Sequence, residues 1–125
     1  MSKQILKLIG YGLVAIIAIN LFQNIYAQTD NGAVQKAIKE GAFLVDVRTP
    51  QEFAEGSAKG AVNIPLNEIN ARLSEFKGKK SIVVFCRSGA RSNQAKNILE
   101  QNGYKNVING GTWENVNKLT QGNKK

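Results

Sequence analysis

Stretches of continuous hydrophobic residues alternate along this chain with stretches in which hydrophobic residues recur every three or four positions. Residues 43–47 and 81–85 are almost continuously hydrophobic, which is typical of strands that a parallel sheet buries on both faces. Two shorter strands are predicted at 60–65 and 104–108, the first ended by Pro65. The pattern therefore predicts four strands, two of them buried.

Helices are predicted between these strands. Hydrophobic residues recur at intervals of three and four from Leu66 to Phe76, so 66–76 is expected to be an amphipathic helix. Thr49, Pro50 and Glu52 carry two helix-start signals, a capping box and a proline at the first helical position. Further helices are expected at 33–40, 92–102 and 113–119, and a tight turn at 109–111.

This alternation predicts one α/β domain with a small, mainly parallel sheet flanked by helices. A chain of 125 residues has room for a single domain. In such folds ligands bind beyond the carboxyl ends of the strands. Cys86 occupies that position, because it directly follows the strand at 81–85 and precedes the helix at 92–102.

The N-terminal segment has a different pattern. Lys3 and Lys7 precede an apolar run at 8–19, and Ala27 is followed by polar residues. This order is that of an export signal, and the run is shorter than the about 20 residues of a membrane-spanning helix. Cleavage after Ala27 and retention as an anchor both remain open, because Ile25 is larger than the residue usual two places earlier.

We therefore expect a signal peptide or membrane anchor at 1–27 and a domain at 28–125, with its core at about 33–118. The protein is expected to be periplasmic or otherwise exported. If the segment is retained, the domain is expected to be anchored to the membrane and to lie outside the cytoplasm. Membrane contact is expected only in that second case.

The net charge of +8 includes two lysines of the N-terminal segment, so residues from Gln28 onward carry about +6. The basic residues are scattered and are not interleaved with aromatic residues as in a nucleic-acid-binding stripe. No nucleic acid partner is expected, and attraction of small anions is the better interpretation.

Cys86 is the only cysteine, and the chain has no histidine. A single cysteine cannot form an internal disulfide, so an unpaired thiol in an oxidising compartment is either inert in the core or kept for its chemistry. The absence of histidine excludes Cys–His and Ser–His–Asp catalysis and most zinc sites. Neither a metal nor another cofactor is expected.

The segment after the strand offers three sources of positive potential that would stabilise a thiolate. The helix that starts near Ser92 directs the positive end of its dipole at the loop. Gly89 and its small neighbours let backbone N–H groups converge on one point. Arg87 and Arg91 add full charges and forked hydrogen bonds for an oxyanion, and they argue against burial of the cysteine. The sequence therefore predicts a reactive nucleophile at Cys86.

This loop consists of Cys86, Arg87, Ser88, Gly89, Ala90, Arg91 and Ser92. It occurs in order with the segments 44–53 and 60–65 and with Gly110-Gly111 before Trp113. Together these segments resemble the rhodanese-like domain family of thiosulfate and persulfide sulfurtransferases. The resemblance covers about residues 33–118 and implies a single-domain rhodanese-like α/β fold, similar in size to exported bacterial members.

The resemblance implies a ping-pong transfer of sulfane sulfur. Cys86 would accept sulfur from thiosulfate or a persulfide as a persulfide and pass it to a thiol or cyanide, and a redox or sulfur-carrier protein is a possible partner. Arg87 and Arg91 would contact substrate and hold the loop, and the backbone amides from Ser88 through Ser92 would form the cradle. Asp46 and Arg48 match a structural pair of the family, and Gly110 and Gly111 would allow close packing beside the loop.

Two departures from the family pattern are present. Ser57 stands where the family usually has a histidine, followed by Ala58 in place of an isoleucine. The histidine position is a structural one in the family, so its loss leaves activity possible and puts the local packing in question. Trp113 also lies closer to Gly110-Gly111 than the usual aromatic residue.

Two other functions compete with sulfur transfer. Cysteine phosphatases and arsenate reductases also hold an oxyanion over a thiolate, but their loops need an arginine six positions after the cysteine, where this chain has Ser92. A non-enzymatic persulfide carrier or docking module is the second alternative, and the presence of Cys86 favours an enzyme over it.

Overall fold

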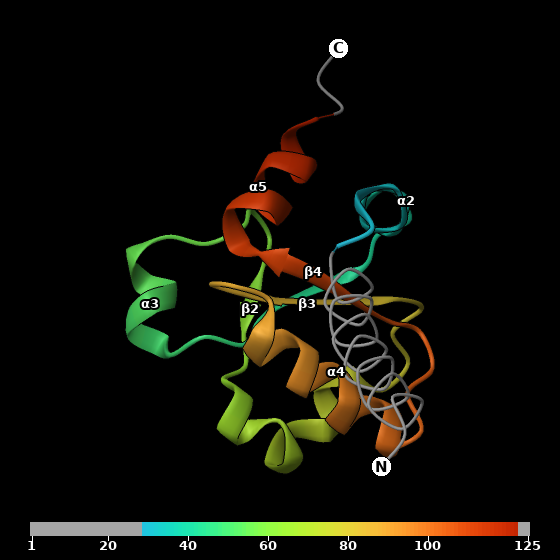
Figure 1. The fold of residues 1–125 in the computed structure, drawn as a ribbon. Helices are drawn as coiled ribbons and strands as arrows, with labels where there is room; N and C mark the ends of the chain where they lie inside the picture. Colours follow the sequence, from blue (N-terminus) through green and yellow to red (C-terminus); the bar gives the residue numbers. More distant parts are fainter. Residues whose placement is uncertain (1–28, 123–125) are drawn as a thin grey trace, which may run out of the picture.

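The computed structural model describes residues 29–122. Its centre is a four-stranded parallel sheet with the strand order β2-β1-β3-β4 (Figure 1). The strands are β1 (Phe43–Asp46), β2 (Val62–Asn63), β3 (Ile82–Cys86) and β4 (Val107–Thr112). The predicted α/β fold with a parallel sheet is therefore confirmed.

Helices cover both faces of the sheet (Figure 1). One face packs against α2 (Asn31–Lys39) and α5 (Trp113–Gln121), and the other against α4 (Ala90–Gln101). The short 3₁₀ helices η1 (Leu66–Glu68) and η2 (Asn70–Phe76) lie on the same side as α4, and α3 (Pro50–Glu55) follows β1.

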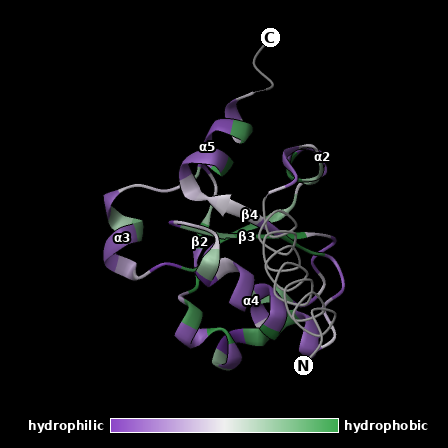
Figure 2. Cartoon of the chain, viewed as in Figure 1, coloured by the Kyte–Doolittle hydropathy of each residue, from purple (hydrophilic) through white to green (hydrophobic). Residues whose placement is uncertain are grey.

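Alternation along β3 divides the core into two halves. Ile82, Val84 and Cys86 belong to the cluster on the α4 side, whereas Val83 and Phe85 belong to the cluster under α2 and α5. All five side chains are fully buried, and Figure 2 shows the hydrophobic strand between helices whose outer faces are polar. The sequence prediction of a strand buried on both faces is confirmed, and the alternation directs the Cys86 side chain toward α4.

The amphipathic helix predicted at 66–76 is present, but as two 3₁₀ helices and not as one α-helix. The segment forms η1 and η2, with non-helical backbone at Arg72 (φ −121°, ψ 25°). Ile69 and Phe76 are nonetheless fully buried, as the hydrophobic spacing required. The interval of four between Ile69 and Leu73 favours a repeat of 3.6, but the non-helical backbone at Arg72 separates two pairs of positions that are each three apart, which 3₁₀ geometry accommodates. The sequence does not reveal that break.

The predicted tight turn at 109–111 is wrong, because these residues extend β4. The strand begins at Val107 and not at residue 104, and its pairing with β3 shifts by one residue, so that Val84 lies opposite Asn109 and Phe85 opposite Gly111. Gly110 is the extra residue of this β-bulge. The longer strand brings Asn109 and Gly111 beside the loop that follows β3.

The predicted N-terminal segment at 1–27 lies outside the described residues. Within residues 29–122, none of the helices has both the length and the hydrophobicity needed to span a bilayer.

Candidate active site

Cys86 is the last residue of β3, and the chain turns sharply after it into α4. Gly89 has φ +95°, a left-handed conformation that side-chain-bearing residues rarely adopt. This turn points the Gly89 backbone N–H back at Cys86, with a nitrogen to Sγ distance of 3.0 Å. Helix α4 begins at Ala90 and not near Ser92 as predicted, so its first turn is part of the loop. The positive end of its dipole therefore lies at the sulfur.

The expectation that Cys86 would not be buried is wrong: the residue has no exposed surface. The two arginines do not prevent burial, because neither is buried with it. Arg87 is exposed, and Arg91 extends toward Glu52. The nearest polar neighbours of the sulfur are therefore the Gly89 backbone N–H and the Ser92 hydroxyl, and not the arginines.

Polar contacts favour the thiolate of Cys86 despite its burial. Burial raises the pKa of the thiol, whereas the Ser92 hydroxyl, when it donates to the sulfur, and the backbone N–H groups of Ser92, Ser88 and Gly89 lower it more. The pKa of Cys86 is therefore lower than its ordinary value. A thiolate is the nucleophilic form of cysteine, so this arrangement suits attack on an electrophilic sulfur.

Asn109 connects the loop to β4. Its side chain donates to the Gly89 carbonyl at 3.1 Å and accepts from the Ser92 hydroxyl at 2.7 Å. Ser92 Oγ in turn lies 3.4 Å from Cys86 Sγ. Sequence reasoning missed Asn109, because an asparagine before two glycines is also a strong turn signal.

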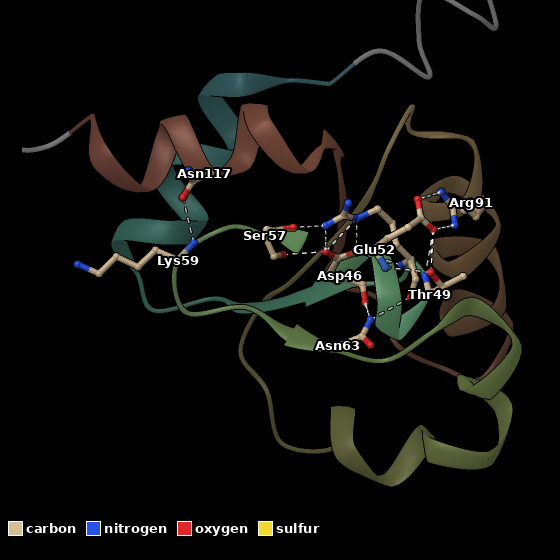
Figure 3. Close-up of polar contacts among 10 residues, drawn as sticks. Asp46, Thr49, Glu52, Ser57, Lys59, Asn63, Arg91 and Asn117 are labelled. Carbon is tan, nitrogen blue, oxygen red and sulfur yellow. Dashed lines mark hydrogen bonds and ion pairs between the residues drawn. The ribbon is translucent and has the colours of Figure 1, made fainter. Parts of the chain in front are cut away.

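Arg91 holds the loop against α3. Its guanidinium donates to both oxygens of Glu52, at 2.7 and 3.0 Å (Figure 3). The Arg91 guanidinium, with smaller contributions from Thr49, lowers the pKa of Glu52 to about 2. Arg91 was predicted to contact substrate and to hold the loop. Its ion pair with Glu52 corresponds to the second role. The sequence identified Glu52 only as part of the capping box, which it also forms.

The remaining loop residues face outward. Arg87, Ser88 and Ala90 are exposed, and Arg87 has no ion-pair or hydrogen-bond partner within residues 29–122. A cavity of about 740 Å³ borders the outer side of the loop and is lined by Ser88, Gly89, Ala90, Asn93 and Gln94, with polar residues of α2 and α5 opposite. It offers room for a small polar molecule beside the loop.

Asp46 and Arg48 form a buried ion pair at the end of β1. The Arg48 backbone N–H and guanidinium donate to the Asp46 carboxylate, with the shortest contact at 2.7 Å. Ser57 donates to the same carboxylate at 2.7 Å (Figure 3). Arg48 also donates to the Gly56 carbonyl at 2.6 Å, and its guanidinium carbon lies 5.1 Å from the centre of the Trp113 ring. The residue in the family's histidine position is therefore a hydrogen-bond donor here.

Gly110 and Gly111 pack closely for different reasons. A Cβ on Gly110 would lie 2.7 Å from Val116 and 2.9 Å from Val83, so a side chain has no room there. Gly111 has φ +79°, and its Cα lies 3.6 Å from where a Cβ on Gly89 would be. The contact of Gly111 with Gly89 places the carboxyl end of β4 against the loop, whereas Gly110 packs against α5 and β3.

Within the described part of the chain, no three histidine, cysteine, aspartate or glutamate side chains are grouped as metal ligands. The backbone N–H groups that converge on Cys86 are hydrogen-bond donors, which suit an anion.

Comparison with known proteins identifies the family. Residues 30–115 match the family model described as the rhodanese-like domain. The chain belongs to the rhodanese-like domain family. A sulfurtransferase of Allochromatium vinosum is 46% identical over 70 residues, which cover 56% of this chain and 65% of that relative. Thiosulfate sulfurtransferase PspE of Escherichia coli is 36% identical over 74 residues, which cover 58% of this chain and 71% of that relative.

A solved structure titled "rhodanese with anions from E. coli" has the same fold, with a TM-score of 0.56 and 35% identity over 60% of this chain and 91% of that one. The matched part of this chain spans just under two thirds of the first relative and slightly more of the second. Both of these curated relatives are named as sulfurtransferases.

Proposed function

We propose that this protein is a thiosulfate sulfurtransferase that carries sulfane sulfur as a persulfide on Cys86. The Gly89 backbone N–H, 3.0 Å from Sγ at the start of α4, is the observation that carries this proposal. It places a fixed donor and a helix dipole at the atom where negative charge is held before and after transfer. The names of the relatives from A. vinosum and E. coli support the same reaction.

Transfer takes two displacements at sulfur. The Cys86 thiolate attacks the outer sulfur of thiosulfate, an S–S bond forms, and sulfite leaves with the electron pair of the broken bond. A thiolate or cyanide then attacks the outer sulfur of the persulfide, and Cys86 leaves as a thiolate. The lowered pKa of Cys86 helps both steps, since the thiolate is nucleophile in the first and leaving group in the second.

The loop residues have distinct tasks in this proposal. Exposed Arg87 attracts the anionic donor, and the amides of Ser88 through Ser92 stabilise the charge on sulfur. Arg91 keeps the loop in place through Glu52. Because Cys86 has no exposed surface, loop residues must move aside to admit the outer sulfur of the donor.

Thiocyanate formation from thiosulfate and cyanide tests the proposal. Wild-type protein is expected to form thiocyanate, and Cys86→Ser is expected to lose the activity while keeping its fold, because a serine hydroxyl is a nearly isosteric but far weaker nucleophile. Hydrolysis of an aryl phosphate serves as the control and is expected to be negligible, since residue 92 is a serine. Phosphatase activity that depends on Cys86 would instead place the protein among the cysteine phosphatases.

We also propose that the domain acts outside the cytoplasm, either released from or anchored by the segment at 1–27. The lysine-flanked apolar run of that segment supports this proposal. N-terminal sequencing of protein from cell fractions is expected to find a start near Gln28 in the soluble periplasmic fraction, or Met1 in membranes facing outward. Protein with an intact N-terminus in the cytoplasm would contradict export.

A further inference from the structure

The orientation of the Asn109 carboxamide is fixed by two backbone groups whose roles cannot change. The Gly111 backbone N–H can only donate, and it lies 3.0 Å from Asn109 Oδ1. The Gly89 carbonyl can only accept, and it lies 3.1 Å from Asn109 Nδ2. Exchanging the oxygen and the nitrogen would set donor against donor and acceptor against acceptor. Oδ1 is therefore the atom that faces Ser92.

Ser92 has one hydroxyl proton and two polar neighbours. Asn109 Oδ1 cannot donate, so the 2.7 Å contact between the two residues requires the proton of Ser92. The 3.4 Å contact with Cys86 Sγ is then made by a lone pair of the Ser92 oxygen. A lone pair accepts the S–H of a thiol but repels a thiolate.

We propose that Asn109 is a positioning residue that competes with Cys86 for the proton of the Ser92 hydroxyl. While Asn109 holds this proton, Ser92 stabilises the thiol form of Cys86. Ser92 stabilises the thiolate only after its hydroxyl turns from Asn109 to the sulfur. The hydrogen bond lost to Asn109 offsets most of the hydrogen bond gained by the thiolate. Ser92 is buried, so water does not relieve this competition.

Charged groups around Cys86 come from several elements. They are Arg87 of the loop, Arg91 of α4 paired with Glu52 of α3, and Asp46 of β1 paired with Arg48. Strand β4, which carries Asn109, has no charged residue. Substitutions at Asn109 and Ser92 leave all these charges in place, so the effect of the hydroxyl can be measured against a constant background.

This inference deepens the proposed function: if Cys86 is the sulfur carrier, Asn109 sets how readily the resting enzyme forms its nucleophile. The competition itself concerns only the reduced thiol. It can be measured by the ultraviolet absorbance of the thiolate, and Cys86 is the only cysteine in the chain. The test therefore succeeds or fails independently of sulfur transfer.

The test is a double-mutant cycle on the pKa of Cys86 with Asn109→Ala, Ser92→Ala and the double variant. Asn109→Ala frees the Ser92 proton for the thiolate and is expected to lower the pKa by about 1, a tenfold rise in thiolate on the acidic side. Ser92→Ala alone is expected to change the pKa little. In the Asn109→Ala background it is expected to raise the pKa back toward the wild-type value.

If Asn109 only supported the loop, Asn109→Ala would shift the pKa of Cys86 in the opposite direction. Loss of the bond to the Gly89 carbonyl would loosen the loop, move the Gly89 N–H from the sulfur and raise the pKa of Cys86. A raised or unchanged pKa in Asn109→Ala, or equal effects of Ser92→Ala in both backgrounds, overturns the proposal. If Asn109→Ala does not fold, Asn109→Ser replaces it in the cycle, because a shorter side chain still accepts from the Gly111 N–H but withdraws from Ser92.

Discussion

At the scale of single residues, small polar side chains supply hydrogen bonds to groups in the interior. Ser57 is the clearest case, since one hydroxyl supplies a hydrogen bond to the fully buried Asp46 carboxylate. Arg48 provides the compensating charge. A buried carboxylate is tolerated only when its oxygens are paired, so the Ser57 bond is part of what makes the ion pair stable.

Replacing Ser57 with alanine is expected to destabilise the protein by about 1–2 kcal/mol, because a hydrogen bond to a buried charge is lost. Urea unfolding followed by circular dichroism measures the change in the free energy of unfolding. Ser74→Ala, at an exposed serine of η2, is the matched control and is expected to change it by less than about 0.5 kcal/mol. Equal losses in both variants would show that the bond to Asp46 contributes nothing.

At the scale of elements, the contact between Glu52 and Arg91 joins α3 to the first turn of α4. Two contacts hold the loop: Arg91 pairs with Glu52 of α3, and Asn109 of β4 donates to the Gly89 carbonyl. Because the loop begins at a central strand and ends in a helix, these contacts hold Gly89 above the sulfur in the resting protein.

The Glu52 pair gives stability a defined pH dependence. The folded pKa of about 2 lies below the ordinary value of about 4.3, so the contribution is complete above pH 4.3 and is lost as the pH falls toward 2. Glu52→Gln is expected to cost about 1 kcal/mol near neutral pH, a modest value because both side chains are partly exposed.

The stability difference between wild type and Glu52→Gln should shrink with acidification. Urea unfolding at several pH values measures it, with Glu55→Gln, exposed at the end of the same helix, as the control. A difference that stays constant down to pH 2, or one that Glu55→Gln reproduces, would contradict a role for the charge of Glu52.

The sequence predicted those elements whose pattern has one structural meaning. The continuous hydrophobic run of β3 is short and rich in Val and Ile, which favours a buried strand over a helix, and Thr49 and Glu52 gave the start of α3 correctly. The 3₁₀ helices were missed because the hydrophobic spacing over 66–76 does not reveal the break at Arg72. The extension of β4 was missed because its bulge is specified by pairing with β3, which local sequence does not contain.

At the scale of the whole molecule, the parallel sheet brings the parts of the site to one edge. Cys86, Asp46 and Thr112 end neighbouring strands, and the loop, α3 and α5 begin just beyond them. The sequence predicted Cys86 and its loop, because strand, cysteine and helix are adjacent in the chain. It could not predict Asn109, 17 residues from Ser92, since only folding brings the two together.

Intact mass spectrometry of reduced protein treated with thiosulfate tests the central claim most directly. We predict a mass gain of one sulfur atom in wild type, its loss on addition of cyanide with release of thiocyanate, and no gain in Cys86→Ser. A gain that persists in cyanide and in small thiols would identify a carrier that does not turn over. A wild-type protein whose mass does not change with thiosulfate would contradict sulfur transfer through Cys86 from this donor.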